Sequence, residues 1–494
     1  MMTYPPSGAL SVRVRESGCF ILNMRTRFPF RFGIVSMTAL PHLFLRLRCT
    51  AGDRTVEGIA SEGLAPKWFT KDPATSILDD LPEMVGVITH AATLALAAGE
   101  GAPKSFFQLW RDLYDAQAAW AREKSIAPLL ANLGVSLVER AVVDALCRSL
   151  NRPFAALLRE NTFGIDLAAV RPGLEGLQIR EILPETPLRS IIARHTVGLG
   201  DALTEADLAP GEAVRDGLPQ TLEEVLSAYE ITHLKIKLFG DVDRDTDRLR
   251  QIAALLQRKA PAGYAFTLDG NENFRSIDHF LNDWNVYLED PALRAFLGHL
   301  LFVEQPLHRD AALGAEAGLA LAAWKDRPPV IIDESDADLS NLPQALALGY
   351  AGTSHKNCKG IVKGIANAAL LRRRSVLHPE SAALLSGEDL SNVGPVALLQ
   401  DLALLATLGI PHAERNGHHY FRGLTMFPQD VQDRTLEAHS DLYHHHEAGF
   451  ATVRVAHGKV SAASAVEAPF GTGFLLDPSR FTPLDQWKPE SVGG

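Results

Sequence analysis

The sequence predicts an α/β protein with a parallel β/α barrel in its middle and an α+β part formed by its two ends. After Pro184, short apolar runs alternate with helical segments, which is the pattern of consecutive β/α units. Before that point, strand-like alternation gives way to Ala- and Leu-rich helical sequence, and the C-terminal end has extended character again. We therefore expect three stretches of chain, 1–185, 186–435 and 436–494.

The composition is that of a globular protein with a large core. Of 494 residues, 46% are hydrophobic and 22% are charged, and the formal net charge is −11. An acidic chain lacks the basic surface that binds phosphate backbones, so we expect no nucleic-acid partner. Its four cysteines form no CxxC pair, which argues against disulfides and zinc and favours the cytoplasm. We find no signal peptide or membrane-spanning run, and expect no membrane partner.

The N-terminal stretch predicts antiparallel strands followed by a helical layer. Val12-Arg13-Val14-Arg15 and Phe44-Leu45-Arg46-Leu47-Arg48 alternate in polarity, as strands with one solvated face do. Segments 91–98 and 117–126 carry helical spacing. From about Leu436 onward the sequence is typical of extended chain.

The barrel prediction depends on a succession of apolar runs with helices between them. The runs are 191–193, 234–238, 264–268, 300–303, 330–332 and, less clearly, 348–352. The helices expected between them include 221–229, 245–259 and 342–348. Six such units in a row favour a closed barrel over an open sheet.

Charged residues follow five of these runs, at the strand ends where a parallel barrel builds its active site. In chain order they are Lys237 with Lys235 two residues before it, Asp269, Glu304, Asp333 and Lys356. Three carboxylates at one barrel mouth repel each other unless a hard cation lies between them, and oxygen ligands favour Mg²⁺ over zinc. Lysines beside that cation can have their pKa lowered toward the range of a general base. The pattern predicts proton abstraction next to a carboxylate, with Mg²⁺ as the cofactor.

The ordered motifs KxK, DxN, EQP, DES and a Lys before a Gly resemble the enolase superfamily, in particular its mandelate-racemase-like and muconate-lactonizing-enzyme-like members. The resemblance covers most of the chain. The opening Phe28-Pro29-Phe30-Arg31-Phe32-Gly33-Ile34 resembles the start of that family's capping domain, and Pro469-Phe470-Gly471-Thr472-Gly473-Phe474 resembles the tail that returns to it. It implies a modified TIM barrel, (β/α)7β, with a capping domain built from the N-terminal segment and the C-terminal tail.

The resemblance also implies roles for the strand-end residues. Asp269, Glu304 and Asp333 would be the Mg²⁺ ligands. Lys237 would be the base, Lys235 its companion in KxK, and Lys356 the acid/base on the opposite side. Mandelate racemases use a histidine in that last place, so a lysine here favours a two-lysine arrangement. Lys359 competes with Lys356 for the role, and the neighbouring His355 leaves the assignment open.

Four further residues are candidates for substrate contact. Asn271 fits either a turn in Asp269-Gly270-Asn271 or a substrate ligand. Glu388 resembles the end of the seventh barrel strand, and His418 lies where an eighth strand would end. Arg31 in the cap, like segment 66–69, is a candidate for closing over the substrate.

These expectations predict an Mg²⁺-dependent lyase or isomerase that acts on a small carboxylate through an enediolate intermediate. Racemisation or epimerisation, acid-sugar dehydration and cycloisomerisation all remain open. The alternative is a catalytically silent member that binds a ligand or serves in an assembly, since fold does not fix function. A metal-dependent hydrolase would usually place histidine ligands at these strand ends, where the sequence has none. We also expect a homo-oligomer.

Overall fold

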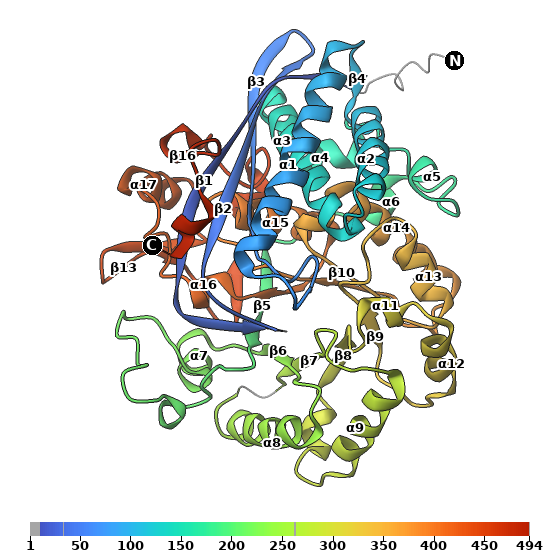
Figure 1. The fold of residues 1–494 in the computed structure, drawn as a ribbon, viewed down its shortest axis with the longest axis vertical. Helices are drawn as coiled ribbons and strands as arrows, with labels where there is room; N and C mark the ends of the chain where they lie inside the picture. Colours follow the sequence, from blue (N-terminus) through green and yellow to red (C-terminus); the bar gives the residue numbers. More distant parts are fainter. Residues whose placement is uncertain (1–9, 33, 261–262, 494) are drawn as a thin grey trace.

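The computed structural model describes residues 10–32, 34–260 and 263–493, and three long antiparallel strands dominate their N-terminal end (Figure 1). These strands are β1 (Ser11–Phe32), β2 (Val35–Ala51) and β3 (Arg54–Gly63), and the short strands β4 (Lys104–Ser105) and β16 (Thr482–Pro483) pair with β1. The predicted antiparallel strands are therefore confirmed. Because β16 belongs to the tail, the two ends of the chain share one sheet.

Helices α1 (Ile77–Glu100), α2 (Phe106–Glu123) and α3 (Pro128–Leu150) pack on this sheet, as the Ala- and Leu-rich sequence predicts. The shorter helices α4 (Phe154–Arg159), α5 (Leu167–Val170) and α6 (Ile179–Ile182) follow them along the chain. The helix expected at 117–126 ends three residues early, because Ser125 has a left-handed φ of 57°.

One helix of the described residues, α1, is long and apolar enough to cross a membrane by length and composition. The sequence analysis did not anticipate such a run. The acidic residues of α1 gather near its ends, at Asp79, Asp80, Glu83 and Glu100, which leaves a long apolar middle. In this structure α1 packs against α2, α3 and β1.

The expectation of one solvated sheet face is only partly correct. Phe44 and Leu45, neighbours on β2, are both fully buried, although successive strand residues point to opposite faces. The ring of Phe44 lies 4.9 Å from that of Phe481 and 6.2 Å from that of Phe427. Segments late in the chain therefore cover part of the face that the local pattern assigns to solvent.

Eight parallel strands form a closed barrel below the cap. They are β5 (Ser190–Val197), β6 (His233–Lys237), β7 (Ala265–Asp269), β8 (Leu300–Glu304), β9 (Val330–Ile332), β10 (Gly352–His355), β11 (Leu384–Gly387) and β12 (His412–Arg415). The pairing of β12 with β5 closes the barrel.

Five of the predicted apolar runs are confirmed as barrel strands, whereas the strand predicted at 348–352 is wrong. Leu348 caps a helix there and Gly349 turns with a φ of 99°, so the strand begins only at Gly352.

Helices alternate with the barrel strands, and those expected at 221–229, 245–259 and 342–348 are present. They are α7 (Leu222–Tyr229), α8 (Val242–Lys259), α9 (Ile277–Glu289), α10 (Arg294–Leu297), α11 (Arg309–Ala312), α12 (Ala315–Ala323), α13 (Asn341–Ala347), α14 (Ile361–Leu377), α15 (Ala397–Leu408) and α16 (Gly417–Tyr420). Short 3-10 turns lie at Glu205–Asp207 and Asn357–Lys359.

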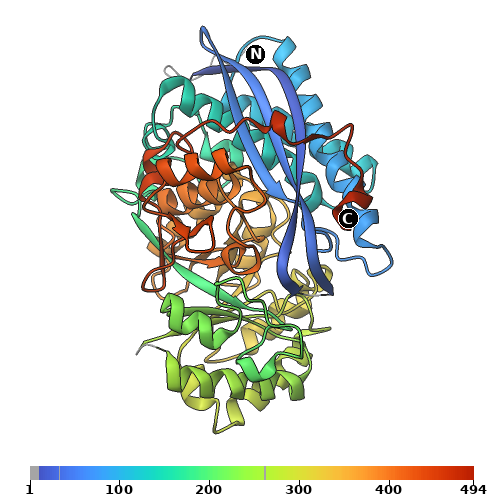
Figure 2. The same cartoon turned by 90° about the vertical axis from the view of Figure 1, so that its left-hand side faces the viewer.

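The tail is less extended than its sequence suggests. It contains α17 (Gln429–Ala438), β13 (Tyr443–His446), β14 (Phe450–Val453), β15 (Lys459–Ser461) and α18 (Ala463–Glu467), then 3-10 turns at Pro478–Arg480 and Pro489–Gly493. Strand β15 pairs with β5 of the barrel, whereas β16 pairs with β1 of the cap. One continuous hydrophobic core includes side chains of both parts. The ends of β1 and β2 reach down to the barrel, as Figures 1 and 2 show.

Candidate active site

Lys235 and Lys237 lie on β6 two residues apart, so both side chains point into the barrel. Lys237 is at the strand end, and its Nζ atom donates to Oδ2 of Asp269 at 2.6 Å. Lys235 lies one layer deeper and is surrounded by acids. Its Nζ atom lies within 3.1 Å of a carboxylate oxygen of each of four residues, Asp269, Glu304, Glu388 and Glu414. Both lysines line the cavity at the barrel mouth, but Lys235 is the counter-ion of four buried acids, whereas Lys237 bonds Asp269.

Lys356 directly follows β10 and approaches the same cavity from the other side. Strands β6 and β10 are four positions apart in an eight-stranded closed barrel, so they face each other across it. The Nζ atom of Lys356 donates to Oδ2 of Asp333 at 2.6 Å. Lys359 bonds Oδ1 of Asp333 at 2.8 Å and its backbone oxygen at 2.7 Å, and it does not line the cavity. This geometry favours Lys356 over Lys359 as the reactive group.

The three predicted metal ligands end the consecutive strands β7, β8 and β9 and are fully buried. Burial alone raises the pKa of Asp333, but Lys356 and Lys359 hold it well below its usual range. The pKa of Asp269 is likewise lowered, by Lys235 and Lys237 against the effect of burial. Glu304 differs, because burial and the nearby Glu388 raise its pKa well above the usual value.

The expected lowering of a lysine pKa is not seen at Lys356. Burial lowers its pKa, but Asp333, Glu388 and Glu304 together raise it above the ordinary value. Lys356 is therefore an ammonium group while its carboxylate partner stays beside it. A cation bound at Asp333 would weaken that pairing.

The donor set fits Mg²⁺ in its chemistry. Asp269, Glu304 and Asp333 offer only oxygen atoms, the ligands that this hard cation prefers. The buried Oε2 atom of Glu304 has no hydrogen-bond partner. Among the described residues, however, no three acidic, histidine or cysteine side chains are spaced as a metal-binding cluster. Lysine ammonium groups lie between the carboxylates instead, so a cation would have to displace some of these ion pairs.

Comparisons with known proteins agree with this architecture. No family model and no curated protein matches the chain, but solved structures do. A muconate lactonizing enzyme from Pseudomonas fluorescens complexed with muconolactone gives a TM-score of 0.57 at 19% sequence identity, covering 95% of this chain and 98% of its own. An N-succinyl Arg/Lys racemase from Bacillus cereus gives 0.55 at 15% identity, over 94% and 98%. An enolase from Bradyrhizobium complexed with magnesium and mandelic acid gives 0.54 at 15% identity, over 94% of each chain. The chain has the enolase-superfamily fold.

The predicted substrate contacts divide into two groups on this enolase-superfamily barrel. Asn271 lines the cavity, and Glu388 lies just beneath it, bonded to Lys235 at 2.5 Å and paired with Arg194. The other two residues lie elsewhere. Arg31 lines a separate cavity with Gly200 and Asp207, because it follows Phe30 on β1 and neighbouring strand residues point to opposite faces. His418 is buried behind the mouth, with its ring 5.4 Å from that of Tyr229.

Several cavity residues escaped the sequence analysis. Asp389 and Ser391 follow β11, while Glu414 and Asn416 lie at the end of β12. Thr196 donates to Oε1 of Glu414 at 2.6 Å. Strand β12 reads His-Ala-Glu-Arg, so it lacks the apolar run that marked the earlier strands. The sequence feature that could have located β12 is its position, one β/α unit after β11.

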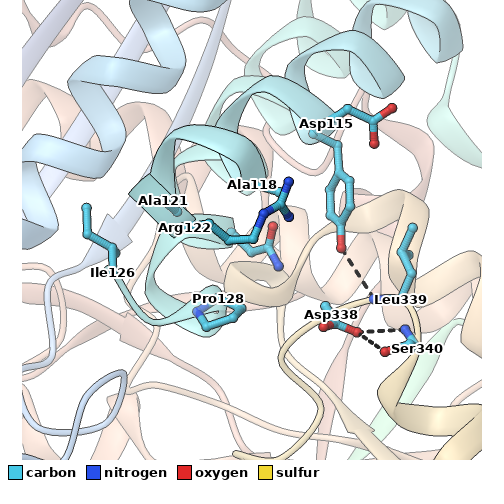
Figure 3. A pocket seen from close by; sticks show the side chains of 12 residues that line it. Asp115, Ala118, Ala121, Arg122, Ile126, Pro128, Asp338, Leu339 and Ser340 are labelled. Atoms are coloured by element: carbon cyan, nitrogen blue, oxygen red, sulfur yellow. Dashed lines mark hydrogen bonds between the residues drawn. The ribbon is translucent and has the colours of Figure 1, made fainter. Parts of the chain in front are cut away.

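A larger cavity, of about 530 Å³, lies away from these lysines, between α2, the start of α3 and residues 338–340 (Figure 3). Tyr114 and Asp338 line it with the exposed Arg122, and the amide of Leu339 donates to the Tyr114 hydroxyl. None of the predicted site residues lines this cavity. This cavity is therefore separate from the one that Lys237 and Lys356 line.

Proposed function

We propose that this protein is an Mg²⁺-dependent isomerase or lyase that abstracts the proton next to the carboxylate of a small acid. The observation that supports it is the placement of Lys237 and Lys356. They come from strands on opposite sides of the barrel and line one buried cavity, each beside a carboxylate. Solved structures of the same fold that are complexed with muconolactone or mandelic acid support a small acid or lactone as the ligand.

Lys237 and Lys356 would act on opposite faces of the bound acid. One lysine, in its neutral form, takes the α-proton, and the other, as an ammonium, faces the opposite side of the same carbon. Return of a proton from the second lysine gives racemisation or epimerisation. Loss or addition of a β-substituent gives dehydration or cycloisomerisation. In every case the negative charge moves onto the substrate's carboxylate oxygens.

Asp269, Glu304 and Asp333 would hold the Mg²⁺ ion. When bound, the ion supplies positive charge that stabilises the enediolate form of the substrate. Lys235 keeps its bonds to Glu388 and Glu414, which are not in the proposed ligand set. These two acids would hold Lys235 in place when the ligand carboxylates bind the cation.

The test is exchange of the α-proton with deuterium in D₂O. The protein is incubated with Mg²⁺ and a library of hydroxy acids, acid sugars, N-acyl amino acids and unsaturated lactone acids, and exchange is followed by NMR. We expect exchange in at least one acid, and its loss in the variants Lys237→Ala and Lys356→Ala with the melting temperature kept. Exchange that persists in both variants would overturn the mechanism. No exchange in any class would favour a silent ligand-binding protein.

A further inference from the structure

The active-site cavity has a polar half and an apolar half. All its polar side chains belong to the barrel, whereas the cap lines it with Phe30, Met37, Ala65 and Trp68. Leu390, which follows β11, continues the apolar surface. Each of these five side chains is at least nine-tenths buried. We call them the apolar wall.

The charged cap residues next to the apolar wall have partners and do not line the cavity. Arg27 bonds Asp216 at 2.6 Å and Lys67 bonds Asp80 at 2.9 Å. Lys71 donates to the backbone oxygen of Asn271 and lies 3.7 Å from Glu272. Arg31 points into a different cavity. Among the residues that the structure describes, the cap therefore contributes no charged side chain to the lining of this cavity.

The apolar wall is held in place from outside. Arg309 donates to the backbone oxygens of Trp68 at 2.9 Å and Phe69 at 2.6 Å, while Glu272 binds its guanidinium with both carboxylate oxygens. On the other side, the Phe30 ring stacks on Tyr420 at 4.0 Å, and the Tyr420 hydroxyl bonds Asp201 at 2.6 Å. The wall is thus a fixed surface rather than a loose cover.

The apolar wall also lies beside the reacting groups. The ring centroid of Trp68 is 5.0 Å from Nζ of Lys356, so a substituent on a carbon near that lysine contacts the indole. The cavity has a volume of about 30 Å³. A space of that size holds on the order of two water molecules, so the cavity between the wall and the lysines has room for only a small group.

We propose that the natural substrate is a carboxylate whose remaining part is small, uncharged and apolar, and that this part packs against Phe30, Met37 and Trp68. The inference rests on the proposed function and names its substrate class. A charged tail would be buried here without a partner, which is unfavourable, whereas an apolar tail gains from the same burial. A polyhydroxylated tail would leave its hydroxyl groups without hydrogen bonds at the wall.

The experiment compares acids that differ only in their tails. For each of two scaffolds, 2-hydroxy acids and N-acetyl amino acids, we would use methyl or isopropyl, hydroxylated, ammonium and carboxylate tails. Binding is measured by calorimetry with Mg²⁺ and the Lys237→Met variant, which cannot turn the acid over, and exchange is measured with the unaltered protein. We expect apolar tails to bind at least tenfold more tightly than charged tails of equal length. A charged or hydroxylated tail that binds as well as the apolar one would overturn the proposal.

Wall variants provide the second arm. Trp68→Ala should increase kcat/KM for a phenyl tail relative to a methyl tail by at least tenfold, because it removes the indole. Leu319→Ala on the exposed surface of α12 is the matched control and should leave that ratio unchanged. An unchanged ratio in Trp68→Ala, with its melting temperature retained, would contradict the assignment.

The two proposals can fail separately. If apolar acids bind but none of them exchanges its α-proton, the substrate class stands and the proposed function fails. If only charged acids exchange, the function stands and the class fails.

Discussion

Glu139 of the cap helix α3 accepts hydrogen bonds from the backbone amides of Ile361 and Val362 at the start of α14, the helix that follows Lys356 and Lys359. Its carboxylate is buried, and a Cβ atom added to Gly360 would lie 2.8 Å from its Oε1 atom. The cap therefore contacts the turn that carries the candidate lysines. Gly360 has a φ of 104°, so glycine is required there for two reasons.

Glu139 gives stability a distinct pH dependence. Burial raises the pKa of Glu139 from 4.5 to about 8 in the folded protein. Between pH 4.5 and about 8 the folded state binds one proton more than the unfolded state. The stabilisation that protonated Glu139 provides is therefore fully present below pH 4.5 and is lost as pH rises through 8. Between pH 4.5 and 8, the free energy of unfolding of Glu139→Gln should rise by a few kcal/mol relative to that of wild type, about 1.4 kcal/mol for each unit of pKa difference. Urea unfolding at several pH values measures it, and parallel profiles would contradict the assignment.

The close approach of Gly360 and Glu139 is tested by a double-mutant cycle. Gly360→Ala should lower the free energy of unfolding by about 1–3 kcal/mol, because it adds a steric contact and a strained φ. In a Glu139→Ala background the steric part disappears, so the loss should be smaller by about 0.5 kcal/mol or more. Equal losses in both backgrounds, measured by urea unfolding, would show that Glu139 is not the group that excludes a side chain.

The two lysines beside Asp333 should behave differently when each is replaced by Met. Lys356→Met should reduce α-proton exchange by about 10²–10⁴-fold, because Lys356 lines the cavity. Lys359→Met should keep measurable exchange, since Lys359 bonds Asp333 and Ser354 but does not itself line the cavity. Exchange rates by NMR, with melting temperatures as the control for folding, decide between them. The reverse order of effects would make Lys359 the acid/base.

Mg²⁺ should stabilise the folded protein and lose that effect in Glu304→Gln. At a concentration about 100 times its Kd, a ligand that binds only the folded state adds about 2.7 kcal/mol to the free energy of unfolding. Denaturant titrations with Mg²⁺ and with EDTA measure the difference. Glu139→Gln is the matched control, because it removes a buried acid outside the proposed ligand set and should retain the response. Equal responses in Glu304→Gln and wild type would exclude Glu304 as a ligand.

The sequence by itself determined the order of the first five barrel strands and the charged residue that ends each of four of them, from Lys237 to Asp333. Those strands are apolar and one β/α unit apart, so local pattern and spacing were sufficient. The same rule missed β10, β11 and β12, which are only four residues long and contain polar residues or glycine in place of a continuous apolar run. Their buried polar groups are satisfied by ion pairs and hydrogen bonds from distant strands, as Arg194 on β5 pairs with Glu388 after β11.

Only the tertiary structure decided which groups meet. Lys235 and Glu414 are far apart in sequence, yet their charges lie 3.1 Å apart because the barrel closes β12 onto β5 beside β6. The cavity's apolar wall likewise depends on where β1 and β2 end over the barrel, which no local pattern encodes. Periodicity reports the face of a strand or helix, whereas the identity of a long-range partner depends on the closure of the whole fold.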